Sequence, residues 1–212
     1  MNRKFKSCLI TGVTGSGGSY LAEHIISKNL NTKLFGLYRS KGYLELLKKK
    51  YKKKINFTKV DLTNYNELKK SLKKFKPDLI FHLASNADVR GSFDHPLAHV
   101  KNNNIITANL LEALRELKLK PLVIICSTSE VYGNVKKRQM PIKENHQIAP
   151  INPYAVTKAF QDLLSQVYRK NYNFKIIITR MFSYTNARRH NLFQTAFAKQ
   201  IAECEKYNKK YI

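Results

Sequence analysis

The chain has 212 residues, of which 43% are hydrophobic and 25% charged, a balance typical of a globular protein with one large core or two modest ones. No apolar run approaches the roughly 20 residues that a membrane-spanning helix needs. The basic N-terminus leads straight into a short apolar run, without the long apolar region of a signal peptide. We therefore expect a cytoplasmic protein with no membrane partner.

Positive charge dominates the composition. Lysine and arginine number 39 against 14 acidic residues, for a formal net charge of +25. This excess raises the hypothesis of a nucleic-acid-binding module, and its densest point is Lys48–Lys54. Lysine, asparagine and isoleucine are abundant along the whole chain, which is typical of a general compositional bias with solvated helix faces. We expect an anionic small substrate and no specific nucleic-acid partner.

Short apolar runs alternate with stretches of helical periodicity. We expect strands at 8–10, 33–37, 55–60, 78–83, 122–126 and 175–180, and helices at 21–26, 44–54, 67–75, 96–119, 153–172 and 191–207. Near-continuous apolar strands that alternate with helices indicate a parallel sheet covered on both faces. The predicted fold is therefore α/β, a doubly wound parallel sheet of the Rossmann type.

Three glycines, Gly12, Gly15 and Gly18, lie between the first expected strand and the first expected helix. Glycine allows a tight turn and a close approach of the backbone to a pyrophosphate, and the N–H groups of the following helix favour phosphate. Ser16 and Gly17 belong to the same turn. The G-x-x-G-x-x-G spacing is one residue wider than the dinucleotide-binding fingerprint, and a plain turn is the alternative.

Polar residues at the carboxyl ends of the strands are further candidates, because ligands bind there in doubly wound sheets. Arg39 ends the second strand about 20 residues beyond the glycine turn, where an acid suits a ribose 2′-hydroxyl and an arginine suits a 2′-phosphate. Asp61, after the third strand, can accept a hydrogen bond from an adenine amino group or cap a helix. Arg39 favours NADP over NAD, and an exposed loop arginine is its alternative.

Tyr154 and Lys158 lie four residues apart at the start of an expected helix and so share one face. A lysine cation beside a phenol lowers the phenol's pKa and makes it a usable general base. Upstream, Ser127–Gly133 (Ser-Thr-Ser-Glu-Val-Tyr-Gly) follows the fifth expected strand. A Y-x-x-x-K pair alone is common by chance, whereas its combination with this strand end and a glycine turn is not.

These motifs resemble the extended short-chain dehydrogenase/reductase superfamily and, within it, the sugar-nucleotide dehydratases and epimerases, the GDP-mannose 4,6-dehydratase family most of all. The likeness rests on Thr11–Glu23, Ser127–Gly133, Pro153–Lys158 and Thr179–Phe182, and it covers essentially the whole chain. Thr128 together with Glu130 favours a dehydratase over an epimerase or reductase. The resemblance implies a hydro-lyase that converts GDP-mannose to its 4-keto-6-deoxy form, with NADP as a cofactor regenerated in each turnover.

The resemblance also implies a role for each residue of the site. Tyr154 would take the proton of the sugar 4-hydroxyl, Thr128 would hydrogen-bond the 4-oxygen, and Glu130 would remove the C5 proton before water leaves from C6. Lys158 would hold the nicotinamide ribose. A loop acid paired with a lysine is the alternative for Glu130. The implied cofactor-binding residues are Gly12, Gly15, Ser16, Gly17, Gly18, Arg39, Asp61, Leu62, Tyr154 and Lys158, and the implied substrate-binding residues are Ser85, Ser183, Arg188 and Arg189.

Two segments depart from the family pattern. Ser183-Tyr184 stand where the family has Asn-His, and Ala187–His190 replaces Pro-Arg-Arg-Gly, which leaves the sugar nucleotide open. Relatives continue into a substrate-binding lobe that here is missing or only begun near 183–212. We expect 1–212 to be an NADP-binding Rossmann domain with the catalytic residues, which binds NADP but turns over a sugar nucleotide slowly or not at all. The resemblance also implies a homo-oligomer.

Other functions stay open. Among enzymes they are a GDP-4-keto-6-deoxy-sugar reductase and a UDP-sugar 4-epimerase, since Ser-x-Ser-Glu-x-Tyr-Gly also occurs in epimerase-like relatives. Outside enzymes they are a non-catalytic nucleotide-binding remnant and a basic nucleic-acid-binding module. A metal site is not expected: His95 and His99 are four apart, but Pro96 places His95 at or before the helix start.

Overall fold

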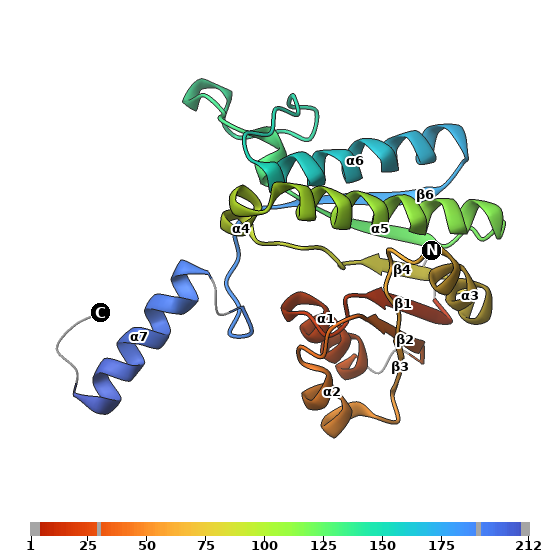
Figure 1. The fold of residues 1–212 in the computed structure, drawn as a ribbon, viewed down its shortest axis with the longest axis horizontal. Coiled ribbons are helices and arrows are strands. Elements are labelled where there is room, and N and C mark those ends of the chain that lie inside the picture. Colours follow the sequence, from red (N-terminus) through yellow and green to blue (C-terminus); the bar gives the residue numbers. More distant parts are fainter. Residues whose placement is uncertain (1–4, 29–30, 190–191, 209–212) are drawn as a thin grey trace. The chain divides into compact units, whose positions relative to one another are not determined.

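The computed structural model describes residues 5–28, 31–189 and 192–208, and within them six strands form one parallel sheet (Figure 1). The strands are β1 (Ser7–Thr11), β2 (Lys33–Tyr38), β3 (Ile55–Lys59), β4 (Leu79–His82), β5 (Leu122–Thr128) and β6 (Lys175–Met181). The predicted α/β fold with a parallel sheet is confirmed. The chain divides into two compact units, residues 1–182 and 183–212, and the sheet belongs to the first.

The order of the strands in the sheet is β3-β2-β1-β4-β5-β6. The winding reverses between β1 and β4, so Thr11 at the end of β1 lies between Leu37 on β2 and His82 on β4. This reversal opens a crevice at the carboxyl ends of β1 and β4, which is where ligands bind in sheets of this kind. The glycine turn follows β1 directly and therefore lies in that crevice.

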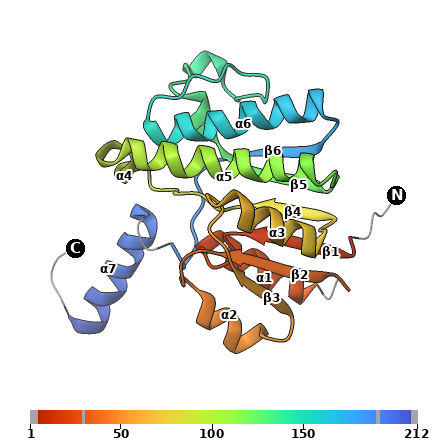
Figure 2. The ribbon, with the colours of Figure 1, turned by 45° about the vertical axis from the view of Figure 1, so that its right-hand side comes forward.

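Helices cover the sheet from both faces (Figures 1 and 2). They are α1 (Ser16–Ser27), α2 (Leu44–Tyr51), α3 (Tyr65–Phe75), α4 (Val89–Asp94), α5 (Pro96–Glu116) and α6 (Pro153–Asn171). Successive strand residues point to opposite faces, so Ile10 joins a buried cluster with Leu47 of α2, whereas Leu9 joins a larger one with Leu110 of α5. Helices α1 and α2 thus cover one face, and α3, α5 and α6 cover the other.

Helix ends account for most of the differences from the predicted elements. The helix expected at 44–54 ends at Tyr51, because Lys52–Lys54 form the turn that leads into β3. The helix expected at 96–119 ends at Glu116, because Lys118 adopts a left-handed φ of 53° that terminates the helical hydrogen bonds. Helix α4 and two 3₁₀ turns, η1 (Ser129–Tyr132) and η2 (Lys137–Gln139), have no counterpart among the predicted elements.

The second unit contains helix α7 (Phe193–Tyr207). The helix expected at 191–207 ends as predicted, while Asn191, its expected first residue, lies outside the described residues. Across the described parts of both units, no helix combines the length and the apolar character that crossing a membrane requires.

Candidate active site

The glycine turn joins β1 to α1. Gly12 adopts a left-handed φ of 69°, and a Cβ there would lie 2.9 Å from the backbone that follows β4. A Cβ on Gly18 would lie 2.2 Å from the Gly12 carbonyl oxygen. Gly15 is the N-cap residue of α1 and contributes no capping side chain, and Ser16 and Gly17 open the helix. No capping side chain covers the N–H groups at the N-terminus of α1, and these groups can bind an anion such as a pyrophosphate.

A cavity of about 170 Å³ opens beside this turn. Its walls include the glycine turn, Arg39 at the end of β2, Asp61 and Leu62 after β3, and Ser85 after β4. The Ser85 Oγ is buried, and no described residue gives it a hydrogen bond. A buried hydroxyl without a partner is destabilising unless a ligand satisfies it. The cavity and its unsatisfied hydroxyl fit a bound dinucleotide.

Arg39 is fixed at the wall of this cavity by two side chains. Its Nη1 donates a hydrogen bond to Asn102 Oδ1 at 2.7 Å and lies 3.8 Å from Asp61 Oδ1. Slight burial acts to raise the pKa of Asp61, but hydrogen bonds from the Thr63 backbone and hydroxyl and the charge of Arg39 hold it below its ordinary value. The helix-cap alternative for Asp61 is wrong, because Asn64 caps α3.

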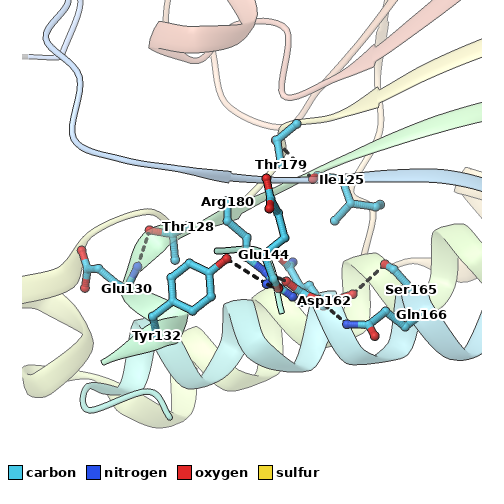
Figure 3. Close-up of polar contacts among 11 residues, drawn as sticks. Ile125, Thr128, Glu130, Tyr132, Glu144, Asp162, Ser165, Gln166, Thr179 and Arg180 are labelled. Carbon is cyan, nitrogen blue, oxygen red and sulfur yellow. Dashed lines mark hydrogen bonds and ion pairs between the residues drawn. The ribbon is translucent and has the colours of Figure 1, made fainter. Parts of the chain in front are cut away.

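Thr128 is the last residue of β5, and Glu130 lies two residues further on, in η1. Thr128 Oγ1 accepts a hydrogen bond from the Glu130 N–H at 3.3 Å, which starts the 3₁₀ turn η1 (Figure 3). The side chain of Glu130 has a different partner: its Oε2 accepts a hydrogen bond from Asn152 Nδ2 at 2.7 Å. The partner of the Glu130 carboxylate is therefore an amide on the far side of the 133–152 loop, and the lysine pairing considered for it is wrong.

Helix α6 presents Tyr154 and Lys158, both buried. The Lys158 Nζ lies 5.9 Å from the centre of the Tyr154 ring and donates a hydrogen bond to the Cys126 carbonyl at 2.8 Å. Burial lowers the pKa of the Lys158 ammonium to about 8, against a smaller opposing effect of Cys126. The Tyr154 N–H is bound by the Ser92 hydroxyl of α4 at 3.2 Å. These contacts fix the first turn of the helix against β5 and α4.

Arg180 on β6 holds the loop that returns to α6. Its Nε and Nη2 bind the buried carboxylate of Asp162 at 2.7 and 3.2 Å (Figure 3). Its Nη1 donates to the Tyr132 hydroxyl at 2.9 Å and to the Glu144 carbonyl at 2.6 Å. Because Tyr132 is the last residue of η1, Arg180 fastens the segment that carries Glu130 to α6 and β6.

A buried polar chain connects the glycine turn to α6. His82 contacts the Thr11 hydroxyl through Nδ1 and the Thr107 hydroxyl through Nε2, each at 2.9 Å. Gln161 of α6 then donates to the Thr107 hydroxyl at 2.7 Å. Burial, and to a lesser degree the charge of Lys158, lowers the pKa of His82 to about 3, so the imidazole is neutral. The chain therefore rigidifies the core between β1 and α6.

Residues 9–212 match the family described as GDP-mannose 4,6 dehydratase. The chain belongs to the GDP-mannose 4,6-dehydratase family. A curated relative, the GDP-mannose 4,6-dehydratase of Vibrio cholerae, is 33% identical over 203 residues, which cover 92% of this chain and 53% of the relative. The resemblance to sugar-nucleotide dehydratases and epimerases is confirmed.

Two solved structures extend the comparison. The UDP-N-acetylglucosamine 4-epimerase of Methanobrevibacter ruminantium has a TM-score of 0.78 and 30% identity, with 90% of this chain and 59% of that chain covered. The UDP-glucose 4-epimerase of Thermus thermophilus, solved with NAD, has a TM-score of 0.71 and 27% identity, with 82% and 54% covered. The chain thus spans somewhat more than half the length of these family members.

The remaining predicted substrate-binding residues, Ser183, Arg188 and Arg189, belong to the second unit, where the N–H groups of Arg188 and Arg189 bind Asn186 in a turn. Among the described residues, no group of three or more histidine, cysteine, aspartate and glutamate side chains is arranged to hold a metal ion.

Three residues of the site were not predicted from the sequence: Asn102, Ser92 and Asn152. Asn102 and Ser92 act across long sequence separations, and no local pattern marks them. Asn152 did carry a signal, because an asparagine directly before a proline is typical of a helix N-cap followed by proline at the first helical position. Its contact with Glu130 joins residues 22 positions apart and could not be predicted from the sequence.

Proposed function

We propose that the first unit carries the cofactor site and the acid–base residues of a sugar-nucleotide 4,6-dehydratase, with GDP-mannose as its substrate. One observation carries the proposal: Glu130 accepts a hydrogen bond from Asn152, two residues before Tyr154. An acid at the end of β5 is thereby held beside the N-terminus of the helix that bears the Y-x-x-x-K pair. A 4,6-dehydratase needs one base for the sugar 4-hydroxyl and another for the C5 proton, and these two elements offer both.

NADP is the cofactor that the cavity residues suit. The backbone of the glycine turn and the N-terminus of α1 would hold the pyrophosphate, Asp61 the adenine amino group, and Arg39 the 2′-phosphate. The Ser85 hydroxyl, buried without a partner in the described chain, would gain one from the ligand. When bound, NADP would supply reversible hydride transfer, from C4 of the sugar and later to C6.

Tyr154 acts first in this proposal. The nearby Lys158 ammonium stabilises its phenolate form, which takes the proton of the sugar 4-hydroxyl as a general base. The Thr128 hydroxyl hydrogen-bonds the 4-oxygen from the end of β5. Because Lys158 has a pKa of about 8, most of it carries its charge at neutral pH, as this role requires.

Glu130 acts second. A ketone at C4 acidifies the neighbouring C5 proton. The Glu130 carboxylate removes this proton and passes it to the C6 hydroxyl, which leaves as water. Two bases on different elements are needed because one removes the proton of the 4-hydroxyl and the other removes the proton of C5. Arg188 and Arg189 of the second unit are proposed to meet the phosphates of the GDP moiety.

A UDP-sugar 4-epimerase is the second candidate. The M. ruminantium epimerase supports this candidate. Its sequence is 30% identical to this chain, almost as much as the 33% of the V. cholerae dehydratase. An epimerase inverts C4 and needs no base at C5. The two functions therefore differ in whether Glu130 is required and in whether the product keeps its C6 oxygen.

The test is incubation of the protein at its full encoded length with NADP and GDP-mannose, with the product analysed by NMR. We expect the 4-keto-6-deoxy sugar, and we expect Glu130→Gln to stop water loss while cofactor affinity stays unchanged. Glu45→Gln, the same change on the exposed face of α2, is the control and should retain activity. Formation of a C4 epimer from a UDP-sugar, with Glu130→Gln fully active, would instead support the epimerase.

A further inference from the structure

We propose that Asn152 is a positioning residue for Glu130, and that it sets the place of the C5 base relative to Tyr154. This inference rests on the proposed dehydratase function. Its basis is that a single side chain makes two contacts: it caps the helix that carries Tyr154, and it binds the carboxylate of Glu130. The two bases of the reaction are thereby connected through one amide.

The geometry of the amide allows one orientation. Asn152 Oδ1 accepts the Ala155 N–H at 2.7 Å, which is the N-cap bond of α6. With the oxygen committed to the cap, the amide plane directs Nδ2 to Glu130 Oε2 at 2.7 Å. Turning the amide over would set its N–H groups against the Ala155 N–H and its oxygen against a carboxylate, so both contacts would be lost.

Glu130 depends on such support because its own element is short. It lies in η1, a four-residue 3₁₀ turn, on a side chain with three rotatable bonds. The end of the 133–152 loop is fastened to the same turn by the Ala149 N–H, which donates to the Val131 carbonyl at 2.8 Å. Asn152 adds a second hydrogen bond between the loop and the turn, and this one binds the Glu130 carboxylate directly. A base that is displaced by about 1 Å can lose on the order of 100-fold in rate, so this contact matters for the C5 step.

Asn152→Ser separates the two contacts. Serine is a good N-cap residue, so the helix keeps its cap, but its hydroxyl is too short to reach Glu130 as well. Asn152→Ala removes both contacts. Asn64→Ser is the matched control, because Asn64 also caps a helix through Oδ1 and donates Nδ2 to a glutamate, Glu67, at 3.1 Å on the surface of α3.

The experiment separates the two halves of the reaction in the protein at its full encoded length. Reduced-nicotinamide absorbance on mixing with GDP-mannose reports oxidation at C4, and NMR of the product reports water loss. For Asn152→Ser we expect unchanged cofactor affinity, KM and C4 oxidation, and water loss slowed on the order of 10- to 100-fold. Asn64→Ser should match the wild type in both steps. Wild-type water loss in Asn152→Ser, or equal slowing of both steps, would overturn the proposal.

A second measurement needs no turnover. A double-mutant cycle with Asn152→Ser and Glu130→Ala, read from denaturant unfolding of the 212-residue chain, should show non-additive stabilities because the two side chains interact. Additive stabilities would overturn the contact. If the wild type forms neither reduced nicotinamide nor product while the cycle is non-additive, the proposed function fails and the Asn152–Glu130 contact stands.

Discussion

Among single residues, Arg39 is the side chain that we propose selects NADP over NAD. It reaches the cavity from the end of β2, and Asn102 and Asp61 hold it there before any ligand binds. A guanidinium that is already oriented loses less entropy when it binds a 2′-phosphate, and its planar fork can make two parallel hydrogen bonds. This arrangement supports the proposal that Arg39 binds the phosphate that distinguishes NADP from NAD.

We predict that Arg39→Ala weakens NADP binding by about 1.5–3 kcal/mol, roughly 10- to 150-fold, because it removes charge-assisted hydrogen bonds. NAD affinity should change little. Isothermal titration of both dinucleotides against the wild type and the variant measures this, with Arg169→Ala on the exposed end of α6 as control. Equal affinity of the wild-type chain for NAD and NADP would contradict the assignment.

His82 gives a prediction for pH. Its pKa falls from an ordinary 6.5 to about 3 on folding, so between these values the unfolded chain binds a proton that the folded chain does not. Stability is therefore lost as the pH falls from about 6.5 towards 3, by up to about 5 kcal/mol from this group. His82→Asn should flatten that dependence in denaturant titrations, whereas His24→Asn on the exposed face of α1 should not. An unchanged slope in His82→Asn would contradict the neutral buried histidine.

Residues in motifs could be predicted from the sequence, and residues that act through tertiary contacts could not. Gly12, Arg39, Tyr154 and Lys158 stand at fixed offsets from expected strands and helices, so their positions followed once the fold class was known. Asn102 contacts a residue 63 positions away, and a single sequence contains no trace of that pairing. The same limit applies to the partner of Glu130.

At the scale of elements, strands were predicted better than helix ends. The run Cys8–Ile10 is wholly apolar because β1 is buried on both faces, and that signal is strong. Helix ends depend on local backbone geometry that hydrophobic periodicity does not register. Leu117 and Leu119 still pack against the core beyond the end of α5, so the apolar pattern continued past the point where Lys118 ended the helix.

The glycine turn is the element with the sharpest expected response to substitution. In Gly18→Ala, the new methyl group would lie 2.2 Å from the Gly12 carbonyl oxygen and 2.9 Å from two further backbone atoms, so the turn must open. We expect a loss of about 3 kcal/mol or more in the free energy of unfolding, together with loss of dinucleotide binding. Thermal unfolding and NADP titration measure the two effects. Wild-type stability and affinity in Gly18→Ala would contradict the close packing of the turn.

At the scale of the whole molecule, the net charge of +25 requires an account. It is spread over many exposed lysines, and that arrangement favours weak attraction to any polyanion. We predict that random duplex DNA binds without sequence preference and that the affinity falls steeply between about 50 and 200 mM salt. Fluorescence anisotropy across that range measures it. Tight binding that persists at high salt would point to a dedicated nucleic-acid site.

In the proposed function, one protein oxidises C4, removes the C5 proton and passes the C4 hydrogen on to C6. The most direct test uses GDP-mannose carrying deuterium at C4, NADP, and the protein at its full encoded length, with the product analysed by NMR. We predict a 4-keto-6-deoxy product with the deuterium at C6. A product that keeps its C6 oxygen and returns the deuterium to C4 would contradict it, as would no conversion by a folded protein that binds NADP.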